Sequence, residues 1–254
     1  MSDRSARLRD EILGAERVLC VQPHYDDNDL AAGGTFASLA DAGVEVHYLT
    51  VTDNIAGVTD PDLSDAEALA RTRQEQDEAG RTIGVRSQTR LDLPDGGDWS
   101  EIPVRTAVIE QIRRLRPDYV FTCDPWLPHE AHRDHLRTGI AVGEAVMFHG
   151  MPRFRTTPEA DAGYVPHDVR GLVLYWTVEP NVTLDVTKTW ERKHEAMGKY
   201  QAQISGQALE NLRRGIAAME KIWGEREGFE RGEALKLLRP GQLHCDIAPR
   251  GLVP

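Results

Sequence analysis

The stretch that decides the fold is Arg17–Asp27, RVLCVQPHYDD, in which a compact apolar run ends in a histidine and two aspartates. The run Arg17–Gln22 predicts a buried strand of a parallel sheet, because strands covered on both faces are apolar almost throughout. Ala31–Ala42 then has the apolar spacing of a helix, and Gly43 is a typical residue to end it. The first unit is therefore predicted to be a strand, a polar turn and a helix.

Strands and helices continue to alternate along the chain. Val44–Val51 predicts a second strand, and Ser64 with Glu67 forms a capping box that begins a helix ending near Ile83. This alternation predicts an α/β fold, with a Rossmann-like, mostly parallel sheet, helices on both faces and a single domain over residues 1–254. The further predicted strands are Arg90–Leu93, Tyr119–Cys123, Gly171–Val178 and Val182–Val186. The further predicted helices are Arg4–Ala15, Glu101–Arg116, Leu136–Phe148, Trp190–Ala202 and Gln207–Arg226. The segment Gly150–His167 and the residues after Arg226 are predicted to be irregular.

Composition limits the class of partner. The net charge of -11 over 254 residues argues against nucleic acid or an anionic membrane surface as the main partner. No apolar stretch approaches the length of a membrane span, and the charged N-terminus lacks the apolar core of a signal peptide. Cys20, Cys123 and Cys245 are too widely spaced to suggest a disulfide framework or a metal knuckle. We therefore expect a cytoplasmic protein with no membrane span and no nucleic-acid partner.

Two polar clusters follow two of the predicted strands. Residues 23–29 read PHYDDND after the first strand, and residues 126–135 read WLPHEAHRDH after the strand Tyr119–Cys123. Because the carboxyl ends of parallel strands meet at one edge of a sheet, we expect the two clusters to lie together. Imidazole nitrogen and carboxylate oxygen are ligands that zinc prefers. The sequence therefore predicts a metal site at this edge.

Each of these residues also has an ordinary structural explanation. Acidic residues after a strand commonly cap the next helix, and a single histidine is more often a surface or capping group than a ligand. The two clusters together favour the metal site, because both lie where this fold places its ligands. Asp134 stays open between two roles: a residue that orients a metal-binding histidine, and a helix N-cap.

These motifs carry a family resemblance. The pattern H-x-D-D at 24–27, the GGT at 33–35 and H-x-D-H at 132–135 resemble zinc-dependent N-acetylglucosaminyl deacetylases of the PIG-L/LmbE-like family. The stretch DPWLPHEAHRDH at 124–135 most resembles the diacetylchitobiose deacetylase branch, and the resemblance extends from about Arg17 to about Gln203. It implies a hydrolase that uses Zn²⁺ to remove the N-acetyl group from a small-molecule amino sugar containing N-acetylglucosamine. Relatives of this branch also suggest a homo-oligomer.

The resemblance implies individual roles, carried over at matching positions. The implied metal ligands are His24, Asp27 and His135. Asp26 matches the general base, and His132 matches the histidine that stabilises the tetrahedral intermediate or protonates the leaving amine. The implied substrate-binding residues are Asp95 and one of Arg71 and Arg73, since the family spacing to Glu75 falls on Thr72 between the two arginines.

Two prolines that are usual in the family motifs are replaced here by Tyr25 and Arg133. Neither replacement removes a ligand or the base, so we expect the metal site to be kept and the substrate preference to differ.

The predicted chemistry is metal-assisted hydrolysis of an amide. Zinc lowers the pKa of bound water from about 15.7 towards about 7. The resemblance implies that Asp27 is the ligand and that Asp26 takes the proton of the attacking water. Adjacent side chains point in different directions, which gives a reason for two separate tasks. His132 is expected to be kept protonated by the charge of two nearby carboxylates, to donate a second hydrogen bond to the oxyanion, and then to give a proton to the amine.

Other functions remain as alternatives. A zinc amidase of the same fold, acting on another sugar conjugate or an acylated natural product, fits the same motifs. A receiver-like phospho-signalling module also has paired aspartates after its first strand, but its third-strand aspartate and fifth-strand lysine are not evident here, and this chain is about twice too long. A non-catalytic sugar-binding module is disfavoured by the intact set of ligands and base.

Overall fold

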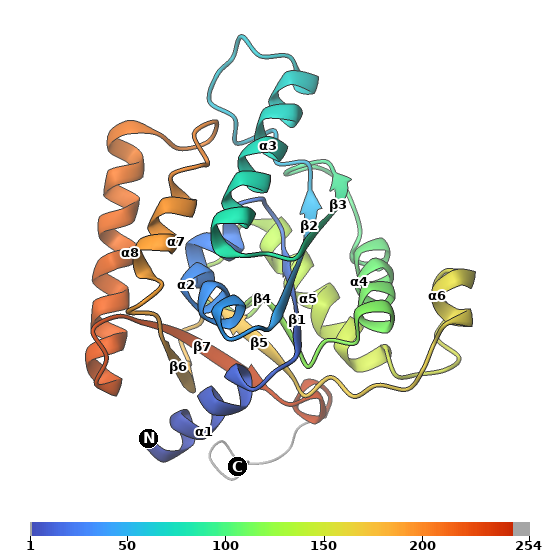
Figure 1. The fold of residues 1–254 in the computed structure, drawn as a ribbon. Helices are drawn as coiled ribbons and strands as arrows, with labels where there is room; N and C mark the ends of the chain where they lie inside the picture. Colours follow the sequence, from blue (N-terminus) through green and yellow to red (C-terminus); the bar gives the residue numbers. More distant parts are fainter. Residues whose placement is uncertain (1, 246–254) are drawn as a thin grey trace.

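The computed structural model describes residues 2–245, and a seven-stranded sheet crosses this part of the chain in the order β3-β2-β1-β4-β5-β7-β6 (Figure 1). The strands are β1 (Arg17–Gln22), β2 (Glu45–Thr52), β3 (Ser87–Leu93), β4 (Tyr119–Cys123), β5 (Gly171–Tyr175), β6 (Val182–Asp185) and β7 (Gly232–Leu238). Strands β1 to β5 pair in parallel, whereas β7 runs antiparallel to both β5 and β6. The predicted α/β, mostly parallel sheet is confirmed.

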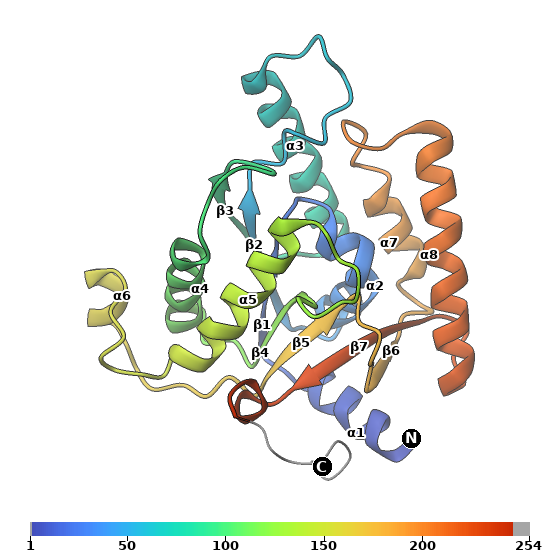
Figure 2. The same cartoon turned by 180° about the vertical axis from the view of Figure 1, so that it is seen from behind.

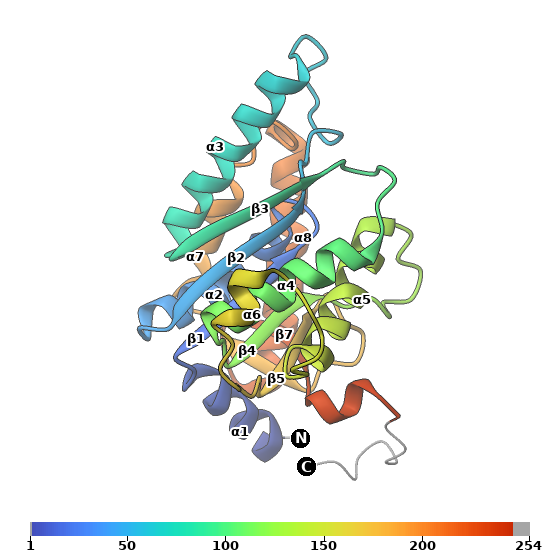
Figure 3. The same ribbon diagram turned by 90° about the vertical axis from the view of Figure 1, so that its right-hand side faces the viewer.

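Helices cover both faces of this sheet, as the turned views show (Figures 2 and 3). The described helices are α1 (Ser2–Leu13), α2 (Asp27–Asp41), α3 (Asp65–Ile83), α4 (Glu101–Leu115), α5 (Arg133–Phe148), α6 (Pro158–Ala162), α7 (Trp190–Met197), α8 (Gly206–Glu227) and the 3-10 turn η1 (Pro240–Leu243). Helices α2, α3 and α7 pack together on one face, and α4 packs on α5 on the other. Each layer of helices packs on its face of the sheet and forms a separate apolar core there.

Two predictions of irregular structure were wrong. The residues after Arg226 include β7, in which the buried Leu235 and Leu237 share a face with the buried Glu233 and alternate with Lys236, so the run looks too polar for a buried strand. Pairing with β5 and β6 on both sides decides its conformation. The predicted loop Gly150–His167 contains the short helix α6, which begins with a Thr157 cap and Pro158.

Several predicted boundaries also moved. Helix α2 begins at Asp27 rather than Ala31, and α5 begins at Arg133 rather than Leu136, so the polar clusters themselves form the first helical turns. Helix α7 ends at Met197 rather than Ala202. A prediction based on apolar periodicity does not detect a first helical turn made of polar residues. The two helices were therefore predicted to begin too late.

The GGT segment lies where α2 is kinked. The backbone of Ala32 departs from helical geometry, and the Glu233 carboxylate accepts hydrogen bonds from the N–H groups of Gly34 and Thr35 at 3.0 and 2.7 Å. A Cβ atom on Gly34 would lie 2.7 Å from the side chain of Val186. Gly34 is therefore required by this close packing.

The order of the strands indicates where this sheet binds a ligand. The chain leaves β1 towards β2 and β3 on one side and later returns to β4 on the other side of β1. The loops after the adjacent strands β1 and β4 therefore lead away from each other. The position between β1 and β4 is a topological switch point, which is where open α/β sheets bind ligands. Within residues 2–245, no helix has the length and apolar character needed to cross a membrane.

Candidate metal centre and active site

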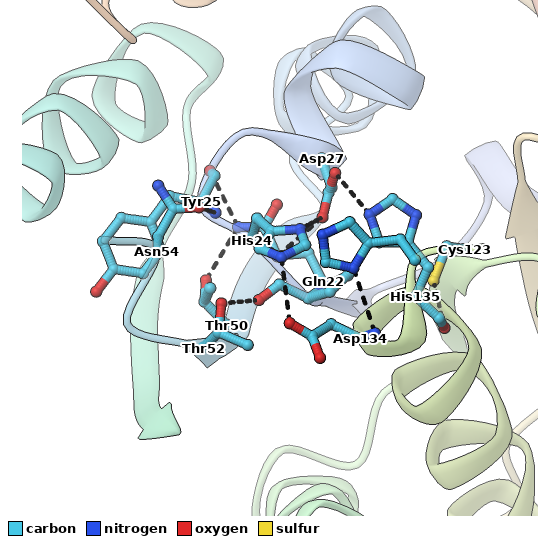
Figure 4. A network of polar contacts seen from close by, with 12 residues as sticks. Gln22, His24, Tyr25, Asp27, Thr50, Thr52, Asn54, Cys123, Asp134 and His135 are labelled. Carbon is cyan, nitrogen blue, oxygen red and sulfur yellow. Dashed lines mark hydrogen bonds and ion pairs between the residues drawn. The ribbon is translucent and has the colours of Figure 1, made fainter. Parts of the chain in front are cut away.

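The turn after β1 is held by hydrogen bonds from its backbone to two polar side chains. The backbone N–H of His24 donates to Asp27 Oδ2 at 2.8 Å, and that of Tyr25 donates to Asn54 Oδ1 at 3.2 Å (Figure 4). Asn54 follows β2 and has a positive φ of 61°. The end of β2 therefore helps hold the turn that carries His24 and Asp27.

His24, Asp27 and His135 converge although they come from two separate parts of the chain. Asp27 lies between the two imidazoles, with Oδ2 at 3.2 Å from His24 Nδ1 and Oδ1 at 3.6 Å from His135 Nε2. One ligand atom from each of the three lies within 4.8 Å of the others. Figure 4 shows the three side chains facing one another. The structure thus brings together the residues predicted as ligands.

The second nitrogen of each histidine faces a carboxylate. His24 Nε2 lies 3.2 Å from Asp95 Oδ1 and 3.5 Å from Asp134 Oδ2, and His135 Nδ1 lies 3.2 Å from Glu130 Oε2. Such carboxylates commonly orient metal-binding imidazoles and fix their tautomers. Asp134 is not the N-cap of α5, a position held by His132, so the first of its two predicted roles is the one that its position supports.

The cluster is electrostatically unbalanced without a cation. Burial alone would lower the pKa of His24, but the Asp27 charge and hydrogen bonds to Asp134, Asp27 and Asp95 raise it to about 12. Burial and the neighbouring Asp27 raise the pKa of Asp26 to about 7. Buried carboxylates therefore draw positive charge to this point, which a divalent cation supplies. Two imidazoles and one carboxylate fit a catalytic zinc ion, which takes three protein ligands and keeps one position open.

A pocket of about 370 Å³ opens directly onto two of these ligands, His24 and Asp27. Its wall is formed by His24, Asp26, Asp27, Ala56, Gly57, Asp95, His132 and Gln203. Asp26 occupies the N-cap position of α2, yet its side chain makes no capping hydrogen bond. Its carboxylate is therefore not used by the helix and is available to the pocket.

His132 lies beside the ligand histidines, with its ring 4.6 Å from that of His24 and 4.9 Å from that of His135, between ring centroids. Its Nδ1 accepts a hydrogen bond from the Asp134 N–H at 3.4 Å. Burial and the neighbouring His24 and His135 lower its pKa, which is the direction opposite to the expectation that carboxylates keep the ring protonated. With Nδ1 accepting, the neutral ring carries its proton on Nε2.

The three predicted substrate-binding residues are placed differently. Asp95 lines the pocket, and its Oδ2 accepts the Ala56 N–H at 3.2 Å. Arg71 pairs with Glu75 at 3.3 Å and Arg73 with Asp92 at 2.6 Å, and neither arginine is in the pocket wall. The structure brings Asp95, but not the two arginines, to the ligand cluster, and their contact with substrate stays a prediction.

Some neighbours of the site were not predicted. Trp176, directly after β5, stacks on His135 with ring centroids 5.4 Å apart and planes 11° apart. Trp176 and His129 have positive φ values of 53° and 69°, so strained backbone surrounds the site at the strand ends. Glu130 also contributes, and its signal was that of a carboxylate within the second histidine cluster; Gln203 lines the pocket as well.

Comparison with known proteins agrees with this geometry. The family described as PIG-L: GlcNAc-PI de-N-acetylase matches residues 19–146. Diacetylchitobiose deacetylase of Thermococcus kodakarensis is 31% identical over 98% of this chain and 93% of its own length. A probable N-acetyl-alpha-D-glucosaminyl L-malate deacetylase of Bacillus cereus is 29% identical over 73% of this chain and 83% of its own length.

A solved structure extends the similarity to the fold. N,N'-diacetylchitobiose deacetylase from Pyrococcus horikoshii, complexed with an inhibitor, superposes with a TM-score of 0.86 at 33% identity, covering 97% of this chain and 95% of the other. The family match at residues 19–146 includes both polar clusters. The chain belongs to the PIG-L family of metal-dependent de-N-acetylases.

Proposed function

We propose that this enzyme hydrolyses the acetamide of an N-acetylglucosamine-containing saccharide, with a diacetylchitobiose-type sugar as the preferred class. One observation carries the proposal: His24, Asp27 and His135 present ligand atoms within 4.8 Å of one another, and two of them, His24 and Asp27, line a pocket. The similarity to two diacetylchitobiose deacetylases over nearly the whole chain supports the saccharide class.

Zn²⁺ is the proposed metal, held by His24, Asp27 and His135. When bound, it supplies Lewis-acid chemistry, since it polarises the acetyl carbonyl and lowers the pKa of water. Zinc is favoured over magnesium or calcium because those harder cations select oxygen ligands, whereas two of the three ligands here are imidazoles. Asp95, Asp134 and Glu130 hold the two rings in the orientation that binding needs.

Asp26 is the proposed general base. Its carboxylate lines the pocket next to the ligand Asp27 and is free of the helix cap. It takes the proton from the water that attacks the acetyl carbon, and this proton is then available for the leaving amine.

His132 is proposed to stabilise the tetrahedral intermediate. Its Nδ1 is occupied by the Asp134 N–H, so Nε2 is the nitrogen that donates. A donor held in place before the reaction stabilises developing negative charge without having to reorganise.

The remaining expectations concern setting and assembly. We infer a cytoplasmic enzyme, a location that the buried free thiols of Cys20 and Cys123 fit. A homo-oligomer, and a substrate contact by Arg71 or Arg73, stay predictions. The substrate itself is taken to be a small-molecule amino sugar, as the size of the pocket supports.

Acetate release tests the proposed function directly. The purified protein is assayed with N-acetylglucosamine, diacetylchitobiose, an N-acetylglucosaminyl inositol and an N-acetylglucosaminyl malate. We expect the highest kcat/KM with diacetylchitobiose. A preference for the inositol or malate glycoside would assign the enzyme to another sugar conjugate, and no release from any of the four would contradict an amino-sugar deacetylase.

A further inference from the structure

One part of the pocket wall comes from the segment that follows α7, at a residue with no assigned role. Gln203 lines the pocket together with the ligands His24 and Asp27, the base Asp26 and the predicted substrate residue Asp95. It is far from all of these in sequence. A side chain that reaches the reacting groups from a separate segment is well placed to contact substrate.

The backbone beside Gln203 is held from two sides. The N–H of Ala202 donates to both carboxylate oxygens of Glu75, at 3.1 and 3.0 Å, which ties the segment to α3. The carbonyl of Ala202 accepts from the N–H and the hydroxyl of Thr59, at 3.0 and 3.2 Å, which ties it to the loop after β2. Binding side chains are most effective when the backbone that carries them is fixed in this way.

Gly57 leaves the room that the Gln203 amide occupies. A Cβ atom on Gly57 would lie 2.7 Å from Gln203 Nε2. Gly57 does not have a positive φ, so the reason for glycine here is close approach rather than backbone conformation. The preceding Ala56 donates its N–H to Asp95 Oδ2, so this short piece of loop contacts Asp95 and Gln203 in turn.

The amide of Gln203 has unused hydrogen-bonding capacity. Its Oε1 is buried and has no hydrogen-bond partner among residues 2–245. A glutamine amide offers both an acceptor and a donor, as a sugar hydroxyl does, whereas the Asp95 carboxylate only accepts. We propose that Gln203 is a substrate-binding residue that recognises a ring hydroxyl of the amino sugar. The proposal rests on the proposed function of the same pocket.

Substitution with a matched control tests this role. Gln203→Met keeps the length of the side chain and removes its hydrogen bonds, and Gln201→Ala serves as the control because Gln201 is exposed and outside the pocket. We expect Gln203→Met to raise KM by about 3–10-fold with kcat nearly unchanged and the metal retained. Gly57→Ala, which displaces the amide, is expected to change KM in the same direction.

Deoxy sugars identify the hydroxyl and separate recognition from a general change in pocket shape. Wild-type enzyme is assayed with 3-deoxy, 4-deoxy and 6-deoxy analogues of N-acetylglucosamine beside the parent sugar. If Gln203 binds one hydroxyl, the penalty of Gln203→Met disappears for the analogue that lacks this hydroxyl and persists for the other two. An equal penalty on every analogue, or kinetics like those of Gln201→Ala, would overturn the proposal.

If Gln203→Met fails to fold, Gln203→Asn replaces it, with the same expectation for the analogues. A wild-type enzyme inactive on all amino sugars would instead refute the proposed function. The two failures are therefore distinguishable.

Discussion

Two buried clusters of charged residues among residues 2–245 are built in opposite ways. Next to α2, Lys193 Nζ lies 2.6 Å from Glu233 Oε1 and 2.7 Å from Glu220 Oε1. Glu220 Oε2 accepts from Trp190 Nε1, and Glu233 Oε2 accepts from the N–H of Thr35 in the kinked α2. At the metal centre, three carboxylates surround the single imidazole of His24 at 3.2 to 3.5 Å.

This difference separates a structural cluster from a candidate metal centre. The lysine cluster supplies its own cation and its own donors, so it is complete within the chain. The His24 cluster instead places three carboxylates around one ring, whose pKa they raise to about 12, and it opens onto a pocket. An excess of buried carboxylates that opens onto a pocket therefore indicates a site for a ligand better than burial alone.

The largest expected effect separates the two aspartates. Asp26→Asn should lower kcat by about 10²–10⁴-fold while the metal stays bound, because it removes the base and no ligand. Asp27→Asn should lose the metal, since Asp27 lies between both histidines. Metal analysis beside acetate release checks both. Loss of metal in the Asp26 variant would show that the two roles are exchanged.

Lys193→Met breaks the lysine cluster and leaves two buried glutamates without their cation. We expect a loss of about 3–5 kcal/mol in the free energy of unfolding, measured with urea. Lys199→Met is the control, because the Lys199–Glu195 pair is exposed, and it should change stability by less than about 1 kcal/mol. Similar losses in the two variants would contradict the structural role of the cluster.

Glu130→Gln tests the carboxylate behind His135. We expect an affinity for zinc about 10–100-fold weaker, because the ring loses its orienting partner and part of its basicity. Competition with a chelator measures this affinity. Glu159→Gln on α6 is the control, and an affinity equal to that of this control would exclude the proposed role of Glu130.

A smaller effect is expected in the pH dependence of stability. Burial opposes the charge of Glu220, but its contacts with His194 and Lys193 lower its pKa from the ordinary 4.5 to about 2. A carboxyl whose pKa is depressed in the folded state contributes stability above about pH 4.5 and loses it as pH falls through about 2. The stability difference between wild type and Glu220→Gln should therefore shrink over this range. Both proteins are measured at each pH, so that any effect of metal release at low pH is common to both. A stability difference that stays constant with pH would contradict this linkage.

The sequence predicted the strands β1 and β4 well because each is an apolar run that ends in a polar cluster. It also predicted that His24, Asp27 and His135 would lie together, since parallel topology brings these strand ends to one edge. The strand β7 was missed because Glu233 and Lys236 interrupt its apolar pattern, and its conformation depends on pairing with β5 and β6.

Other parts of the site depend on contacts between distant segments. The stacking of Trp176 on His135 and the approach of Gln203 to Gly57 join residues far apart in the chain, and no local pattern marks them. The cluster of Lys193 with Glu220 and Glu233 is hidden for the same reason, since each residue alone fits an ordinary helix or strand surface.

The most direct test of the central claim is the metal content of the protein, measured together with acetate release from diacetylchitobiose. Wild-type protein and His135→Ala are assayed as purified, after chelation and after zinc is returned. We predict about one zinc ion per wild-type chain, activity lost on chelation and regained with zinc, and neither metal nor activity in His135→Ala. Full activity after the metal is removed, or one firmly bound zinc ion in His135→Ala, would contradict the assignment of His24, Asp27 and His135 as the catalytic metal centre.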